Sequence, residues 1–129
     1  MRNLRYGAFI DVLLTTLPEV QQRYAALKDE LGDNALPHIV VALVLEPLAR
    51  QALGTTDDAL LRRIFAFFEG MACSEDVEVQ NLLYVGIFEA WVGERETLSH
   101  AWKYMGECTE DLASDAAHRL SCGGNLPRG

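Results

Sequence analysis

Apolar residues recur at helical spacing along most of the chain and predict an all-helical protein. Between Asn3 and Thr16 they fall at intervals of three or four positions, as expected for a helix with one buried face. Proline and glycine mark further boundaries, because proline suits the first turn of a helix and glycine commonly follows its last turn. The pattern predicts about seven helices, at residues 3–16, 18–31, 37–54, 55–72, 74–92, 95–104 and 109–120.

Local signals predict how several of these helices begin and where one of them is irregular. Ser74 and Thr109 are typical N-cap residues, and Thr55-x-x-Asp58 resembles a capping box. Pro47 lies inside the third helix, where its missing N–H should kink or split the helix near Leu45–Glu46.

Two further segments indicate how the helices pack. Residues 82–88 contain no polar group except the Tyr84 hydroxyl, so we expect a central helix covered by neighbours on both sides. Phe67 departs from the apolar stripe of the helix 55–72 and is a candidate for exposure. No segment shows the alternation typical of strands. Antiparallel helices of about 15 residues with short connections predict a short right-handed HEAT- or armadillo-like stack, with a globular helical bundle as the alternative.

The chain is long enough for one domain with a substantial core. It has 129 residues, of which 50% are hydrophobic and 23% are charged, and this composition excludes disorder and a disulfide-dependent mini-protein. We therefore expect a single helical domain over residues 1–129, with a frayed tail at about 122–129 because that segment is rich in glycine.

The charge is strongly negative and unevenly distributed. The net charge is −8, which argues against nucleic-acid binding because phosphates require clustered Lys and Arg. Residues 1–54 contain six acidic and five basic residues, whereas residues 55–129 contain thirteen and six. A surface of one sign favours association with a partner of the opposite sign. The candidate partner-binding residues are Asp57, Asp58, Glu75, Asp76, Glu78, Glu89, Glu94 and Glu96.

Paired-carboxylate chemistry is excluded by spacing. Glu78 and Glu89 are eleven residues apart, which places them about 20° apart on one helix face but about 16 Å apart along it. That separation exceeds the roughly 5–9 Å needed for two-carboxylate hydrolysis. The two residues are therefore predicted to form one acidic ridge, and no catalytic residue is assigned.

The cysteines and histidines indicate no catalytic or metal site. His118-x-x-x-Cys122 is the best candidate for metal binding, but its spacing matches no established zinc pattern. No metal or cofactor is therefore predicted, and the protein is not expected to be an enzyme. His38, in the first turn of the helix 37–54, suits a core or capping role better than a binding role.

The number of cysteines helps to predict the cellular compartment of the protein. Cys73, Cys108 and Cys122 show no C-x-x-C spacing, which is typical of free thiols in a reducing compartment. The chain also shows neither a recognisable leader peptide nor an apolar run long enough to cross a membrane. The expected location is the cytoplasm, with no membrane partner.

Four segments resemble a bacterial protein family. They are Leu36-Pro37-His38-Ile39-Val40, the run from Leu60 to Glu69, the run from Asp76 to Leu83 with Gly86 and Glu89, and the run from Ala101 to Gly106. Across roughly residues 17–106, the chain resembles a poorly characterised all-helical family. That family includes immunity proteins of polymorphic and contact-dependent growth inhibition toxins.

The resemblance implies a cytoplasmic immunity protein that neutralises a cognate toxin by binding it. Many such toxins are basic nuclease domains, so the carboxylates named above would pair with Lys and Arg of the toxin while a few apolar residues anchor it. The alternative is a helical-repeat adaptor or regulatory protein-binding module unrelated to toxins. The sequence leaves the oligomeric state open.

Overall fold

The structure is a computed structural model that describes residues 3–127. Over this range every regular element is a helix and there is no strand, which confirms the predicted all-α class. The helices are α1 (Phe9–Thr16), α2 (Gln21–Leu31), α3 (Pro37–Val40), α4 (Glu46–Thr55), α5 (Asp58–Ala72), α6 (Val77–Leu83), α7 (Glu89–Trp91), α8 (Arg95–Trp102) and α9 (Glu107–Arg119).

Two π-helical segments join four of these helices into two continuous runs. Val41–Leu45 connects α3 to α4, and Tyr84–Phe88 connects α6 to α7. In a π-helix the N–H of residue i+5, rather than i+4, bonds to the carbonyl of residue i. The first segment ends two residues before Pro47, so the helix is irregular close to the predicted position, but it continues through Leu45–Glu46 and is not split there. The second segment was not predicted.

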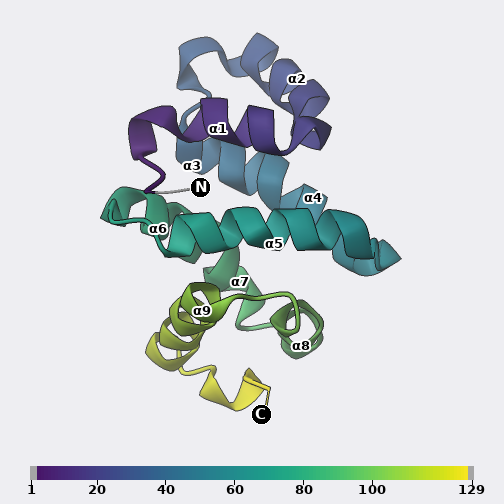
Figure 1. The fold of residues 1–129 in the computed structure, drawn as a ribbon, viewed down its shortest axis with the longest axis vertical. Coiled ribbons are helices and arrows are strands. Elements are labelled where there is room, and N and C mark those ends of the chain that lie inside the picture. Colours follow the sequence, from purple (N-terminus) through teal and green to yellow (C-terminus); the bar gives the residue numbers. More distant parts are fainter. Residues whose placement is uncertain (1–2, 128–129) are drawn as a thin grey trace.

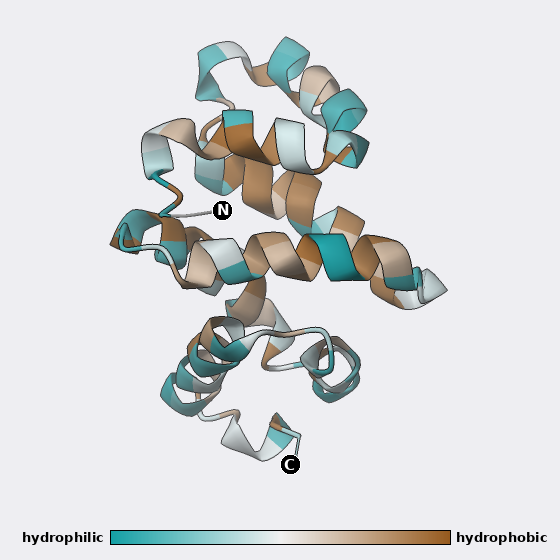
Figure 2. Ribbon diagram, in the orientation of Figure 1, coloured by the Kyte–Doolittle hydropathy of each residue, from teal (hydrophilic) through white to brown (hydrophobic). Residues whose placement is uncertain are grey.

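Helix α5 crosses the middle of the molecule (Figure 1). Helices α1 to α4 lie on one side of it, and α7, α8 and α9 lie on the other. The most hydrophobic stretches of ribbon follow α1, α3 and α5, whereas α2 and α9 are largely hydrophilic (Figure 2). Helix α5 contacts α4, α6 and α9, and it therefore connects the two halves. The more specific right-handed stack remains a prediction.

Because it lies between two layers, α5 is buried on more than one face. Leu61, Ile64, Phe65 and Phe68 face the core as its apolar stripe predicts. The expected exposure of Phe67 is wrong, since its side chain is fully buried and its ring centroid lies 5.8 Å from that of Phe9. Phe67 lies outside the apolar stripe of α5 because its side chain packs against Phe9 of α1, on the other side of the helix from α9.

The run α6–α7 is only partly covered, which corrects the prediction of a central helix enclosed on both sides. Ile87, Phe88 and Trp91 are fully buried, but Val77 and Val85 are 72% and 49% exposed. Helix α6 therefore presents one apolar face to the core and a second face to solvent.

The starts of α6 and α9 differ from the predictions. Helix α6 begins at Val77, with Asp76 as its N-cap. Ser74 instead donates its hydroxyl to the carbonyl of Leu4 and accepts a hydrogen bond from the N–H of Asp76. Helix α9 begins after Gly106, and Thr109 lies buried in its first turn. The capping residue of α5 is Asp57, which accepts from the N–H of Leu60.

The C-terminal segment is folded against the domain as far as Pro127, in contrast to the expected frayed tail. Residues Gly123–Asn125 form a 3-10 turn. The Asn125 side-chain amide donates to the carbonyl of Val92 at 2.9 Å, and its oxygen accepts from Arg95 at 3.2 Å. Leu126 packs against the core. Residues 128–129 of the predicted tail lie outside the described residues.

Candidate functional site

Four of the eight predicted partner-binding carboxylates are engaged within the fold. Asp57 and Asp76 cap α5 and α6. Asp58 accepts from Arg62 at 2.9 Å and from the Tyr104 hydroxyl at 3.0 Å. The Arg62 hydrogen bond, followed by that of Tyr104, lowers the pKa of the Asp58 carboxyl.

The fourth engaged carboxylate, Glu94, belongs to a network that joins α4 to the start of α8. Arg50 donates to both oxygens of Glu94, at 2.7 and 3.1 Å, and also to Glu46 at 2.9 Å. The indole N–H of Trp91 donates to Glu46 at 2.9 Å. The hydrogen bond from Arg50 lowers the pKa of the Glu94 carboxyl. This network holds helices together and leaves Glu94 with little capacity for a partner.

The other four predicted residues remain exposed. Glu75, Glu78, Glu89 and Glu96 have carboxylates that form no ion pair or hydrogen bond with any residue in the range 3–127. These four residues are the part of the predicted site that stays open to a partner.

The second π-helical segment lies along the predicted ridge from Glu78 to Glu89. Tyr84–Phe88 lies between the two residues. A π-turn contains about one residue more than an α-turn, and each α-helical residue corresponds to about 100° of rotation. The offset of about 20° calculated for an unbroken α-helix therefore does not apply across this segment, and the single ridge stays a prediction.

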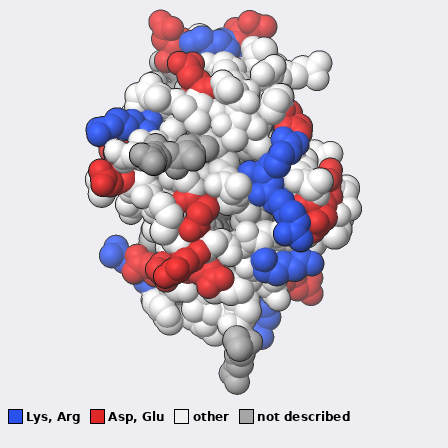
Figure 3. Space-filling view, viewed as in Figure 1, with Lys and Arg blue, Asp and Glu red and all other residues white. Residues whose placement is uncertain are grey.

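The sequence analysis missed an acidic group on α9. Glu107, Glu110 and Asp111 lie in the first two turns of this helix and form no ion pair within the described chain. One turn later, Asp115 pairs with Arg119 at 3.2 Å. Figure 3 shows carboxylates gathered over α9 at the lower left, with a column of basic side chains along the right of the same face. The density of acidic residues from 107 to 115 was the signal that could have identified this group.

Helix α6 is flanked by hollows on both sides. The larger is a cavity of about 540 Å³ between α6 and the run α3–α4. Its lining consists of Tyr6, His38, Ala42, Glu78, Asn81, Leu82, Val85 and Gly86. On the side facing α9 lie two smaller hollows of about 160 and 240 Å³, which share Gln80, Leu112 and Asp115. Of the predicted site residues, only Glu78 lines any of these hollows. His38, expected to have a core or capping role, lines the cavity and is exposed.

The junction of α5 with α9 is built around Glu69. Its carboxylate accepts from the backbone N–H groups of Cys108 and Thr109, at 3.0 and 2.9 Å, and from the Thr109 hydroxyl at 2.6 Å. Glu69 thus caps the positive end of a helix remote in sequence. A Cβ at Gly106 would lie only 2.6 Å from Glu69 Oε1, so this approach requires glycine. Burial acts to raise the pKa of Glu69, but the three hydrogen bonds outweigh it and the pKa is lowered.

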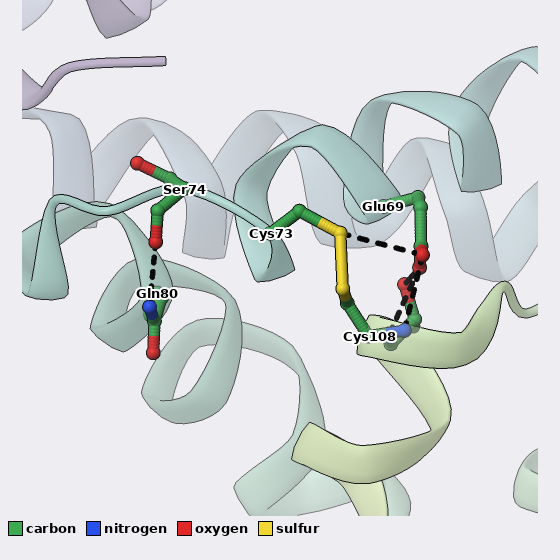
Figure 4. The surroundings of a disulfide bond; sticks show 6 residues. Glu69, Cys73, Ser74, Gln80 and Cys108 are labelled. Atoms are coloured by element: carbon green, nitrogen blue, oxygen red, sulfur yellow. Dashed lines mark hydrogen bonds between the residues drawn. A yellow bond between two sulfur atoms is a disulfide. The ribbon is translucent and has the colours of Figure 1, made fainter. Parts of the chain in front are cut away.

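A disulfide closes the same junction (Figure 4). Cys73, which directly follows α5 and lies one turn after Glu69, is bonded to Cys108 on α9, with a Cα–Cα distance of 5.5 Å. The prediction of free thiols is wrong for these two residues because the fold brings together cysteines 35 residues apart. Cys122 remains a free thiol. Since disulfides persist in oxidising compartments, the argument from cysteine content for the cytoplasm no longer holds.

Metal-ligating side chains come together in one place within residues 3–127. Glu69, Cys73 and Cys108 offer ligand atoms within 4.8 Å of one another. The two sulfur atoms are bonded to each other, and both Glu69 oxygens accept hydrogen bonds from the start of α9. The group therefore holds two helices together. His118 and Cys122, weighed from the sequence, are not part of it.

Comparison with protein families gives one match. The profile of a family described as a domain of unknown function (DUF7674) matches residues 10–115. This range includes the α5–α9 junction and all of α6. It also includes the residues that line the hollows beside α6, apart from Tyr6 and Arg119. No curated protein and no solved structure matches the chain.

Proposed function

The chain belongs to the DUF7674 family, and we propose that it is an immunity protein that binds and neutralises a cognate toxin. The partner we propose is a basic nuclease domain of a contact-dependent growth inhibition system. The observation that carries this proposal is the set of exposed carboxylates that form no ion pair within residues 3–127, together with the exposed apolar residues of the run α6–α7.

Charge supports a basic partner. Glu75 and Glu78 on one side of α6, and Glu107, Glu110 and Asp111 on α9, leave a local excess of negative charge. Such an excess accelerates encounter with a positively charged protein and discriminates against acidic ones. It also suits a competitor for the surface with which a nuclease meets phosphates, since both would contact the same Lys and Arg side chains.

Exposed apolar residues would supply the binding affinity that carboxylates alone do not provide. Charged groups at an interface contribute mainly to association rate and specificity, whereas buried apolar and aromatic contacts carry most of the affinity. Val77 on α6 and Val85 in the π-helical segment that follows it are both exposed and lie eight residues apart. Because α6 has hollows on both sides, this surface is uneven and suits a partner whose side chains fit into the hollows.

Calorimetric titration tests the proposal directly. The titrant is the C-terminal domain of the toxin encoded immediately upstream of the gene for this chain, at low and at high salt. We expect a nanomolar Kd that weakens steeply with salt, because exposed charge pairs are screened. The absence of binding at both salt concentrations would contradict the proposal and favour a helical adaptor with a partner unrelated to toxins.

A charge-reversal variant tests the surface. Combining Glu75→Lys, Glu78→Lys and Glu89→Lys should leave the helical circular dichroism unchanged and raise the Kd at least tenfold. The matched control combines Asp11→Lys, Asp29→Lys and Glu30→Lys, which makes the same change in net charge on α1 and α2. Equal loss of affinity in both variants would mean that net charge alone, and not this surface, attracts the toxin.

The proposed location is the cytoplasm, as the resemblance implies. No helix within residues 3–127 is long and apolar enough to cross a membrane. The location makes a prediction about the disulfide, because a reducing cytoplasm should hold Cys73 and Cys108 as thiols. Alkylation of thiols in intact cells, followed by mass spectrometry, measures their state. A fully oxidised pair in growing cells would contradict the cytoplasmic location.

A further inference from the structure

The cavity between α6 and the run α3–α4 contains both of the π-helical segments in its wall. Ala42 comes from the first segment, and Val85 and Gly86 come from the second. Such segments are rare and occur frequently at functional sites. A π-helical segment is wider than an α-helix. Both segments occur where the two helical runs border the cavity.

Close packing beneath the cavity fixes its floor. A Cβ at Gly86 would overlap the Cγ1 atom of Val41, which is itself fully buried. The two π-helical segments therefore approach each other more closely than any larger residue at position 86 would permit. Ala42 and Gly86, with their small side chains, leave the space above this contact open.

The lining combines an apolar wall with a polar rim. Leu82, Val85 and Ala42 supply the apolar wall, whereas Glu78 and Asn81 lie in the first and second turns of α6. The Glu78 carboxylate has no partner in the range 3–127. A volume of about 540 Å³ falls within the range of pockets that bind ligands.

This combination suits a group with an apolar stem and a positively charged end. Lysine and arginine side chains bury their methylene groups along apolar surfaces and keep their charged heads at the edge. Arginine matches a carboxylate with two parallel hydrogen bonds and can also donate to a side-chain amide oxygen. Glu78 and Asn81 supply these two kinds of acceptor at the rim, and the exposed Val85 extends the apolar wall toward the partner.

We propose that this cavity receives an arginine side chain of the protein partner, with Glu78 as its counter-ion. The inference rests on the proposed function, because it assumes a basic protein as the occupant of the α6 face. It goes further in selecting one site among the exposed carboxylates. The other exposed carboxylates would contribute to long-range attraction of the partner, whereas the cavity would anchor the contact.

A peptide titration followed by NMR tests the inference without any toxin. The probe is acetyl-Leu-Arg-Leu-amide at millimolar concentration, and the control probe carries citrulline, the neutral isostere of arginine. We expect shifts in the backbone amides of Ala42, Glu78 and Val85 with the arginine peptide, and none with the citrulline peptide. Shifts confined to other surfaces, equal shifts with both peptides, or no shifts would overturn the proposal.

Two variants and a matched control localise the effect. Ala42→Trp fills the cavity and Glu78→Gln removes its charge while keeping its shape, so each should abolish the peptide-induced shifts. Leu43→Trp introduces the same side chain at an adjacent exposed residue that does not line the cavity and should preserve them. Because Glu78 is exposed, the second variant keeps the test decisive if the first fails to fold.

The same variants separate this inference from the proposed function. When titrated with the toxin domain, Ala42→Trp and Glu78→Gln should each raise the Kd at least tenfold, and Leu43→Trp should not. Tight binding by the original protein with unchanged affinity in both cavity variants would overturn the cavity as the anchor and leave the immunity function standing. A toxin that does not bind the original protein would contradict the immunity function, and the peptide titration would still decide about the cavity.

Discussion

The two junctions on either side of the α5–α6 corner are built in opposite ways. Where α5 meets α9, a disulfide, a carboxylate with three donors and a glycine without space for a side chain close the contact. Where the run α3–α4 meets α6, two π-helical segments border a cavity of about 540 Å³ that is lined by the exposed Val85 and Glu78. The first arrangement serves stability, whereas the second leaves polar and apolar groups available for a partner.

Two glycines show how similar sequence features serve these different ends. A Cβ at Gly106 would meet the Glu69 carboxylate, and a Cβ at Gly86 would meet the side chain of Val41. The first glycine admits a polar group that satisfies the backbone N–H groups of α9. The second admits only an apolar contact and leaves the cavity above it open. The close approach at Gly106 therefore completes a hydrogen-bonded helix cap, whereas the close approach at Gly86 borders an open cavity.

Reduction of the disulfide should have the largest effect on the closed junction. Cys73 and Cys108 are 35 residues apart, and the loss of a cross-link over such a loop costs about 4 kcal/mol of unfolding free energy. Urea unfolding of the double variant Cys73→Ser/Cys108→Ser against the oxidised protein measures this difference. An unchanged midpoint of unfolding would show that the Glu69 contacts alone close the junction.

Removal of the Glu69 carboxylate should have the next largest effect. Glu69→Ala leaves the N–H groups of Cys108 and Thr109 and the Thr109 hydroxyl without this acceptor, and we expect a loss of about 3 kcal/mol. Asp57→Ala removes an ordinary exposed cap from α5 and should cost about 1 kcal/mol. Thermal unfolding of both variants makes the comparison. Equal losses would mean that the Glu69 cap contributes no more than a local one.

Gly86→Ala tests whether the open junction also has a rigid part. The added methyl group would overlap Val41, which is buried, and overpacking of this kind costs about 2 kcal/mol. Gly54→Ala is the matched control, because nothing lies within 4 Å of the position of its Cβ. Chemical unfolding that shows no difference between the two would contradict the close approach of the π-helical segments.

The helices could be predicted from local patterns, but the two junctions could not. Proline at positions 18 and 37 and the apolar spacing gave seven helical runs, since α3–α4 and α6–α7 are each continuous. The π-helical segment Tyr84–Phe88 lies where Gly86 packs against Val41, and the disulfide depends on the packing of α9 against α5. Both involve contacts between residues remote in sequence. For the same reason, Thr109 satisfied the rule for an N-cap and yet lies buried against Glu69.

The sequence indicated which residue types form the candidate site, but not which of those residues stay exposed. Charge density identified Glu75 and Glu78 as candidates, and both remain exposed. The same density did not distinguish them from Glu94, whose carboxylate is held by Arg50, because the ion pair joins residues 44 positions apart. Exposure of Val77 and Val85 could not be read from the pattern, since their apolar side chains fit a fully buried helix equally well.

Acid should weaken the closed junction through Glu69. The pKa of its carboxyl is lowered below the usual value of 4.5 in the folded protein, so its contribution to stability is present above that pH. The contribution is lost as the pH falls through the folded pKa. Glu69→Gln carries no titrating group at this position, and its stability difference from the original protein should shrink on acidification. Thermal unfolding at pH 7 and pH 3 measures the change, and a difference that grows toward low pH would contradict the lowered pKa.

The smallest effect on stability is expected on the exposed face of α6. Val77 and Val85 are 72% and 49% exposed, so Val77→Ser and Val85→Ser should change the free energy of unfolding by no more than about 0.5 kcal/mol. Their effect on toxin binding should be larger if they anchor the interface, because the few residues that anchor the centre of an interface each cost more than about 1 kcal/mol of binding energy when truncated. Leu120→Ser provides a control of similar exposure, 44%, at the far end of α9. Calorimetric titration and urea unfolding of the three variants separate the two quantities. A loss of stability without a loss of affinity would reverse the assignment of this face, because α6 would then serve the fold in the way that the α5–α9 junction does.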